Sequence, residues 1–217
     1  MELTKDETIK ASIVQAAQKL FQHYGLSKTT MEDIAKALGK SKSSLYYYYA
    51  TKEEIFQAVV QQEKDIIFTD IKAAIGKVNS AKDKFKIFAV TKFKEIKKRQ
   101  ILHKIILDEI YDNVCLFEII RKKYDITEID IIKSILRHGV TTGEFFIENN
   151  KKLEAISLIC AVTLRGIQMN FIFDNNADCG AMDDLLVTSI EMLLNALKRE
   201  QSLNEREIAA FANMQAV

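Results

Sequence analysis

Proline is absent from the 217-residue chain, and only seven glycines occur. Both residue types interrupt helices, so their scarcity favours a chain made of helices and short connections. Hydrophobic residues make up 48% of the sequence and charged residues 28%, which is typical of a globular protein with a core of its own. We therefore expect an all-α fold.

Cysteine-rich motifs, long apolar runs and leader sequences are missing as well. Cys115, Cys160 and Cys179 show no CxxC spacing, which argues against a disulfide framework or a zinc site and predicts reduced thiols. No apolar run reaches the ~18 residues of a membrane span, and residues 1–10 lack the apolar stretch of a signal peptide. We expect a cytoplasmic protein with no metal, cofactor or membrane partner.

Sequence motifs of enzymes are lacking. The chain has no glycine-rich phosphate loop and no GxSxG sequence. His23, His103 and His138 are scattered, without the spacing of metal ligands or a nearby nucleophile pattern. We predict that the chain is not an enzyme.

The charge is small overall but unevenly distributed. The net charge of +1 gives no general attraction to nucleic acids. Between residues 26 and 52, however, five lysines face only Glu32 and Asp33, and five minus two gives a local charge of +3. A small basic region on a neutral protein fits a DNA-binding unit better than a general polyanion binder.

The amino-terminal quarter predicts a series of capped helices. Apolar residues between Thr8 and Tyr24 recur every three or four positions, which indicates an amphipathic helix that ends at Gly25. Thr30, with Asp33 three positions later, has the pattern of a capping box and predicts the start of a second, short helix.

Helical signals continue along the rest of the chain. Ser41 is suited to cap a helix that runs to about Tyr48, and Thr51 a long helix that reaches about Val78. Helical periodicity marks further apolar stripes at residues 85–96, 101–110, 129–140, 152–173 and 182–199.

The segment from Ser41 to Tyr48 has the properties of the reading helix in a helix–turn–helix. Such a helix is short, polar on one face and held rigidly by an apolar opposite face, which Leu45 and the later tyrosines would supply. Lysines and hydroxyl groups can contact bases or phosphates, and helix starts favour phosphate oxygens. We predict DNA contacts from Lys28, Thr29, Thr30, Lys40, Ser41, Lys42, Ser43, Ser44, Tyr46, Tyr47 and Lys52.

The tyrosine run also permits a second interpretation, in which the rings form an aromatic cluster inside the head. We expect this packing role for Tyr48 and Tyr49, and an outward, DNA-facing position for Tyr46 and Tyr47.

The order of these segments is itself informative. The chain reads IVQAAQKLFQHYG at 13–25, TTMEDIAKALGKSKSSLYYYY at 29–49 and TKEEIF at 51–56. From about Thr8 to Val60 it thereby resembles the head of the TetR/AcrR family of bacterial transcription regulators. It departs from the family pattern where Lys40 replaces valine, Tyr49 phenylalanine and Ala50 proline. GEF at 143–145 is similar to a GEFR signature of the family, with Phe146 in place of the arginine.

The resemblance implies an all-α fold of about nine helices and a homodimer in which the last two long helices pair with those of a partner. Residues 7–56 would form the DNA-binding head, with the helix–turn–helix at 30–49. Residues 57–200 would form a larger ligand-binding and dimerisation domain, and residues 201–217 a carboxyl-terminal tail.

The last two apolar stripes carry more apolar surface than a small bundle readily covers, so we expect them to form the dimer interface. The alternative is that they form only the core of the bundle itself. The predicted interface residues are Ile156, Ile159, Val162, Gly166, Leu186, Ile190, Leu193 and Leu197.

The function that follows is sequence-specific regulation of transcription by a homodimeric repressor, which a small molecule releases from a palindromic double-stranded DNA operator. The alternatives are a helical small-molecule-binding protein or enzyme without a DNA role, and an activator controlled by a protein partner. The candidate ligand-binding residues, for each of which an ordinary core or surface role is the alternative, are Phe88, Lys92, His103, Leu107, Tyr111, Phe117, Arg165, Gln168 and Met169.

Overall fold

The computed structural model describes residues 4–99, 114–173 and 179–197, and the side chains there except at 114–124, 173 and 179–182. These residues form eight helices and no strand, so the predicted all-α fold is confirmed. The stripe predicted at 101–110 and the tail at 201–217 lie outside the described residues. The helices are α1 (Lys5–Tyr24), α2 (Met31–Ala37), α3 (Lys42–Tyr46), α4 (Lys52–Ile75), α5 (Ala81–Lys98), α7 (Val114–Thr141), α8 (Asn150–Phe173) and α9 (Cys179–Ala196).

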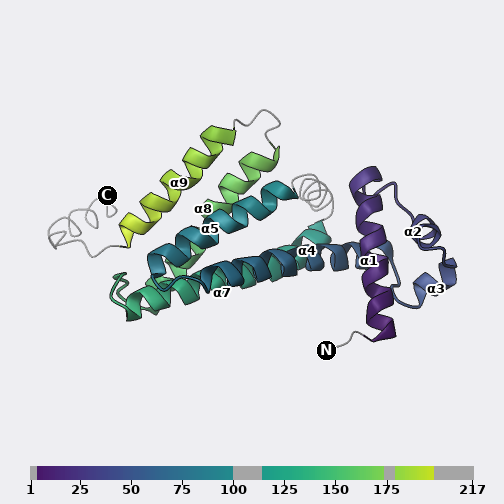
Figure 1. Cartoon of the computed structure of the whole chain (residues 1–217), viewed down its shortest axis with the longest axis horizontal. Coiled ribbons are helices and arrows are strands. Elements are labelled where there is room, and N and C mark those ends of the chain that lie inside the picture. Colours follow the sequence, from purple (N-terminus) through teal and green to yellow (C-terminus); the bar gives the residue numbers. More distant parts are fainter. Residues whose placement is uncertain (1–3, 100–113, 174–178, 198–217) are drawn as a thin grey trace, which may run out of the picture.

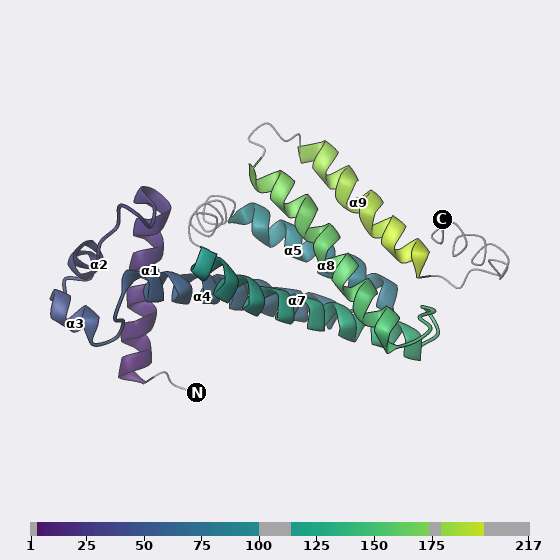
Figure 2. The ribbon, with the colours of Figure 1, turned by 180° about the vertical axis from the view of Figure 1, so that it is seen from behind.

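The helices are arranged as a small head and a larger bundle that share one long helix. Figure 1 shows α1, α2 and α3 at one end of the molecule and α5, α7, α8 and α9 at the other, with α4 running from the head into the bundle. The view from behind shows the same separation (Figure 2). The first three helices therefore lie at one end of the molecule, and the helices that follow α4 lie at the other.

Hydroxyl side chains cap the helices of the head. Thr30 Oγ1 accepts a hydrogen bond from the Asp33 N–H at 3.2 Å, and the Asp33 carboxylate accepts one from the Thr30 N–H at 2.9 Å. This reciprocal pair is the capping box that the sequence predicted at the start of α2. The hydroxyls of Ser41 and Thr51 cap α3 and α4 by accepting from Ser44 and Glu54 N–H groups.

The first helix begins at Lys5, one turn earlier than the predicted start near Thr8. Thr4 and Glu7 form a further capping box, in which the Thr4 N–H donates to the Glu7 carboxylate at 2.8 Å. Hydrogen bonds from the Thr4 backbone and hydroxyl hold the pKa of Glu7 below its usual value. The additional turn precedes the apolar stripe, so hydrophobic periodicity gave no sign of it.

The head has its own apolar core around α1 and the start of α4. The rings of Phe21 and Phe56 meet edge to face, with centroids 5.7 Å apart, and Leu45 of α3 is fully buried beside them in the same cluster. Burial of side chains of this size stabilises the head by about 1.5–3 kcal/mol each. The buried members are Ile13, Val14, Ala17, Phe21, Leu26, Met31, Ile34, Ala35, Leu45, Ile55, Phe56, Val59 and Val60.

A second apolar core fills the bundle. It begins at Ile67 on α4 and takes in side chains from α5, α7, α8 and α9. Between Val60, the last head-core residue of α4, and Ile67, two charged residues are buried instead: Glu63 and Lys64. The two cores therefore meet along one continuous helix, with buried charges at the junction.

The GEF segment fastens the loop after α7 to the start of α5. The Glu144 carboxylate accepts hydrogen bonds from the Ser80 hydroxyl at 2.7 Å and from the Ala81 N–H at 2.8 Å. These two contacts are the main reasons why the pKa of Glu144 falls to about 2. Glu144 thus caps α5 from a distant part of the chain, at the end where the helix dipole favours a negative charge.

Glycine is required at two positions that precede Glu144. Gly143 has a φ of +76°, in the left-handed region that other residues rarely adopt. Gly139 lies under the ring of Phe145, and a Cβ atom added there would come within 2.1 Å of Phe145 Cδ2. The GEF sequence is therefore a structural element that closes the end of the bundle.

Both faces of α8 are apolar, but they have different surroundings. Leu153, Cys160 and Leu164 lie in the bundle core, whereas Leu158, Ile159 and Val162 are about half exposed in the single chain. By length and composition α8 could also cross a membrane, but in this structure it packs between α7 and α9 (Figure 1).

The structure corrects part of the predicted dimer interface. The side chains of Leu186, Ile190 and Leu197 are buried at 5%, 3% and 2% exposure in the core of their own chain. Ile156 and Leu193 are half-buried and pack against the same core. Among the described side chains of α9, the large apolar ones that are exposed are Leu185, Val187 and Met192. Of the predicted set, only Ile159, Val162 and Gly166 are exposed.

Candidate nucleic-acid interface

The short helix α3 lies at the end of the head that points away from the bundle (Figure 1). Leu45 fixes it from behind, because its side chain is fully buried in the head core. At its amino-terminal end the Ser41 hydroxyl accepts from the Ser44 N–H at 3.2 Å and lies 3.0 Å from the Ser43 hydroxyl. The helix is therefore anchored on one side and open on the other.

The open side carries the side chains that the sequence assigned to DNA contact. Tyr46 and Tyr47 are 48% and 78% exposed, and Lys40, Lys42 and Ser43 are exposed beside them. Lys42 Nζ lies 3.9 Å from a carboxylate oxygen of Glu32, with both side chains more than half exposed. A surface contact of this kind is worth at most about 1 kcal/mol, so Lys42 remains available to a base or phosphate.

The following tyrosines hold α3 against the rest of the head. The Tyr48 hydroxyl donates to the Asp6 carboxylate on α1 at 3.2 Å, and Tyr48 and Tyr49 both pack against the head core. Burial, followed by the contact with Asp6, raises the pKa of Tyr48, and burial raises that of Tyr49. These two residues therefore have the packing role expected for them.

Thr29 does not fit the role predicted for it. Its side chain is 1% exposed, and its hydroxyl donates to the Gly25 carbonyl at 2.7 Å. The Thr29 N–H is also used, in a bond to the Leu26 carbonyl. Thr30 is exposed, but its hydroxyl donates to Asp33 at 2.6 Å within the capping box. We therefore remove Thr29 from the proposed contacts.

Lys52 also differs from the prediction, which placed it on a DNA phosphate. Its ammonium donates to the carbonyl oxygens of Leu26 at 2.8 Å, Ser27 at 3.2 Å and Thr29 at 3.2 Å. All three donor positions of a lysine are thereby used on the loop between α1 and α2. Lys52 ties the first turn of α4 to this loop, and we remove it from the phosphate contacts.

Sequence reasoning missed one cation that lies close to the predicted set. Lys36 on α2 and Lys28 line a groove of about 470 Å³ between α1 and α2, together with Asp33. Both lysines are exposed. With Lys40 and Lys42 they form a group of exposed lysines on and next to α2 and α3. Lys36 contributes to the local charge of +3 between residues 26 and 52, but its position beside Lys28 follows only from the fold.

The predicted ligand-binding residues are not gathered in one place by the described part of the chain. His103, Leu107 and Tyr111, and the side chain of Phe117, lie outside the described residues. Phe88 is fully buried in the bundle core, and Gln168 and Met169 are half-buried on α8. Phe88, Gln168 and Met169 are not among the described walls of the hollow of about 510 Å³ beside α4, which are Ala58, Gln61, Gln62, Asp65, Ile66, Thr69 and Asp70.

The two charged members of that set form ion pairs. Lys92 on α5 is paired with Glu128 on α7, and both side chains are buried. Arg165 on α8 donates to Asp125 on α7 at 2.6 Å from Nη2 and 3.3 Å from Nη1. Each pair joins two helices of the bundle. A buried pair of this kind is costly to break on one side only, because the remaining charge is left uncompensated.

Comparison with known proteins is consistent with this geometry. Residues 13–59 match the family described as bacterial regulatory proteins of the tetR family. Residues 70–199, more than half of the chain, match the carboxyl-terminal region of QacR-like proteins. The two matches correspond to the head and to most of the bundle.

Individual relatives are similar mainly over the head. The transcriptional regulator RutR of Escherichia coli K12 is 39% identical over 64 residues, which are 30% of this chain and 30% of RutR. The negative transcriptional regulator IcaR of Staphylococcus epidermidis is 42% identical over 53 residues, 24% of this chain and 29% of IcaR. The chain thus matches less than a third of the length of these relatives.

Solved structures extend the similarity to the bundle. A transcriptional regulator from Cytophaga hutchinsonii is 28% identical, with a TM-score of 0.68 over 86% of this chain and 97% of that one. Salmonella enterica GusR shares the fold, with a TM-score of 0.72 at 19% identity over 92% of this chain and all of that one. The chain belongs to the tetR family of bacterial regulatory proteins, whose members are regulators of transcription and not enzymes.

Proposed function

We propose that this protein is a homodimeric transcriptional repressor of the cytoplasm, which a small molecule releases from a palindromic DNA operator. The observation that carries the proposal is the structure of α3. Leu45 anchors this helix from behind, while Lys42, Ser43, Tyr46 and Tyr47 are directed outward at the end of the head. A short helix held in this way can enter the major groove and present side chains to base edges.

Phosphate contacts would come from the cations around α3. Lys28, Lys36 and Lys40 are exposed on the loops and helix next to it. Phosphate contacts fix the register of a protein on the duplex, and base contacts provide the specificity. In this arrangement Lys42 and the two outward tyrosines are the residues that select the sequence.

The exposed faces of α8 and α9 favour a dimer formed through these helices. On α8, Val162 lies four positions after Leu158 and three after Ile159, opposite the face that fills the bundle core. Leu185 and Met192 are exposed seven positions apart on α9. A helix that is apolar on both faces is stable in water when a second surface covers the outer face.

A dimer would place two copies of α3 on one duplex. Reading helices about 34–36 Å apart fit successive major grooves, which makes a palindromic operator the expected target. An effector that binds in the bundle would lower DNA affinity only if it prefers a state with a different spacing of the two heads. The names of two relatives, the negative regulator IcaR and the repressor KstR2 of Mycolicibacterium smegmatis, favour repression over activation.

Selection of binding sites from a pool of random duplexes tests the proposal. We expect recovery of an inverted repeat with half-sites one or two helical turns apart. On that duplex Lys42→Ala should weaken binding by about 1–3 kcal/mol and relax the preference at one base pair. Lys94→Ala, which removes an exposed lysine of the bundle, is the matched control and should bind like the wild type. If no sequence were enriched, the proposal would be wrong.

A further inference from the structure

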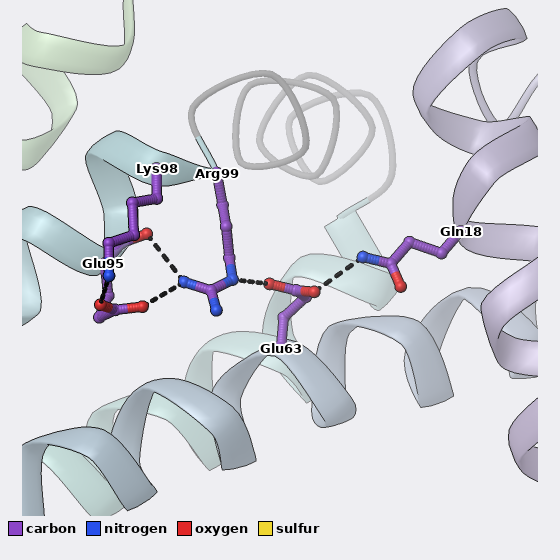
Figure 3. Close-up of polar contacts among 5 residues, drawn as sticks. All are labelled: Gln18, Glu63, Glu95, Lys98 and Arg99. Carbon is purple, nitrogen blue, oxygen red and sulfur yellow. Dashed lines mark hydrogen bonds and ion pairs between the residues drawn. The ribbon is translucent and has the colours of Figure 1, made fainter.

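A line of polar side chains connects the head to the end of α5. Gln18 on α1 donates from Nε2 to Glu63 Oε1 on α4 at 2.8 Å. Arg99, the residue that follows α5, places Nε 2.9 Å from Glu63 Oε2. In Figure 3, Gln18 and Arg99 reach Glu63 from opposite sides. We call Gln18, Glu63 and Arg99 the polar chain.

Glu63 occupies a position where a charge is costly. Its side chain is 4% exposed, and it lies between the apolar residues of α4 that fill the head core and those that fill the bundle core. A buried carboxylate without a cation is strongly destabilising, so the guanidinium of Arg99 offsets the cost of burying Glu63. An apolar residue at this position would need no ionic partner. The charge of Glu63 therefore serves to fix the positions of Gln18 and Arg99 relative to α4.

Arg99 is held by the last turn of α5 as well as by Glu63. Its Nη1 donates to the Glu95 carboxylate and, at 3.2 Å, to the Glu95 carbonyl. The Glu95 side chain is 7% exposed, and it also accepts from Lys98 Nζ at 2.5 Å. The guanidinium therefore joins two buried carboxylates, one on α5 and one on α4. Any displacement of the last turn of α5 along α4 would change the separation of Arg99 and Glu63.

The contact between Arg99 and Glu63 is less constrained than the others. It is an ion pair without the alignment of a hydrogen bond, and Glu63 Oε2 has no aligned donor among the described residues. Its partner oxygen, by contrast, is fixed by Gln18. The carboxylate is thus firmly attached to the head and more loosely attached to α5.

We propose that Glu63 and Arg99 are positioning residues for DNA binding: the polar chain couples the last turn of α5 to the orientation of the head. The inference rests on the proposed function and specifies how its DNA-binding surface is controlled. A ligand that moves the end of α5 would act on α1 through Glu63. Coupling of this kind changes affinity without any contact between the residues and the DNA.

A double-mutant cycle on operator affinity tests the coupling. Arg99→Gln and Gln18→Ala should each weaken binding to the selected duplex about 5- to 30-fold. Because both changes act through Glu63, the double variant should bind the duplex no more weakly than whichever single variant has the lower affinity. Lys98→Ala is the control, since Lys98 contacts Glu95 but is 67% exposed and stands outside the polar chain. It should bind like the wild type.

Amide hydrogen exchange of the free protein gives a second readout that needs no DNA. Arg99→Gln should speed exchange in residues 13–24 of α1 more than in α8, whereas general destabilisation would speed both alike. If Arg99→Gln does not fold, Arg99→Lys keeps a positive charge next to Glu63 but cannot span both carboxylates in the same way. It should give the same pattern with a smaller change.

The outcomes separate the two proposals. If the wild type enriches no duplex while exchange in α1 responds to Arg99, the proposed function fails and the coupling stands. If the wild type binds its duplex and the two single changes multiply in the double variant, the coupling is wrong. Equal effects of Lys98→Ala and Arg99→Gln would also overturn it.

Discussion

Lys52 offers a sharp test of the difference between a phosphate contact and a structural clamp. Its ammonium donates to the carbonyls of Leu26, Ser27 and Thr29, and its side chain is half-buried. Hydrogen bonds from a charged donor contribute about 1.5–3 kcal/mol each when isolated. Three acceptors share one charge here and the group is partly exposed, so we expect Lys52→Ala to lower the free energy of unfolding by about 1–3 kcal/mol in total.

The salt dependence of DNA binding separates the two roles. Loss of a lysine that contacts a phosphate reduces the slope of log affinity against log salt by about 0.9 per contact, or ~1.8 in a dimer. If Lys52 is a clamp, Lys52→Ala should weaken binding because the α1–α2 loop shifts, while the slope stays the same. Lys40→Ala removes an exposed lysine and serves as the comparison. It should flatten the slope without lowering the free energy of unfolding.

The measurement is a fluorescence anisotropy titration of each variant with the selected duplex at several salt concentrations, combined with urea unfolding. Lys52→Arg adds a useful third case, because a guanidinium keeps the charge but presents its donors in a plane. It should recover part of the unfolding free energy. The reasoning would be refuted if Lys52→Ala flattened the slope as much as Lys40→Ala and unfolded at the same urea concentration as the wild type.

Two further predictions concern the bundle. Ile159→Glu places a charge on the outer face of α8, where Ile159 is 54% exposed in the single chain. Burial of each isoleucine in a dimer interface would stabilise the dimer by ~1.5–3 kcal/mol, so this variant should sediment as a monomer where the wild type sediments as a dimer. Gln22→Glu on α1 adds the same charge elsewhere and should leave the dimer intact. Glu144→Gln should lower the free energy of unfolding at neutral pH by about 1–2 kcal/mol. The pKa of Glu144 in the folded protein is lowered to about 2. Its contribution to the free energy of unfolding is therefore present above about pH 4.5 and is lost as the pH falls toward 2. In urea unfolding, the stabilities of the wild type and of Glu144→Gln should converge over that pH range.

Features specified by neighbouring residues could be predicted from the sequence. Thr30, Ser41 and Thr51 each cap a helix through a residue three positions later, so the pattern is visible in four letters. The buried side of the head helices follows from their period in the same way. Thr4 caps α1 with the same local signal through Glu7, but this cap lies before the apolar stripe from which the helix was predicted.

Features that depend on distant residues could not be predicted. The acceptors of Lys52 are 23 to 26 positions away, so a lysine at a helix start looks like any surface cation. Gln18 and Glu63 are 45 positions apart, and Lys92 and Glu128 are 36 apart. A single sequence records which residues are charged but not which of them meet.

Helices α8 and α9 show a different limit of prediction from the sequence. Periodicity identified the wide apolar stripes of α8 and α9, but each stripe has an inner and an outer part. The pattern of Leu186, Ile190 and Leu197 is as compatible with a dimer interface as that of Ile159 and Val162. Only the packing of α5 and α7 against α8 and α9 decides which part is already covered within the chain.

In the proposed coupling, the geometry of α4 would convert a small displacement at α5 into a larger one at the head. α4 runs over 24 residues without glycine or proline, so it has no internal hinge and is about 36 Å long. A rotation of ~5° about its bundle end would move its first turn by on the order of 3 Å. If the two heads of a dimer moved in opposite directions, the distance between their reading helices would change by roughly twice that. Such a change is substantial compared with the deviation from one DNA turn that binding to successive major grooves tolerates. Side-chain contacts at Glu63, between the two cores, are therefore well placed to set that rotation.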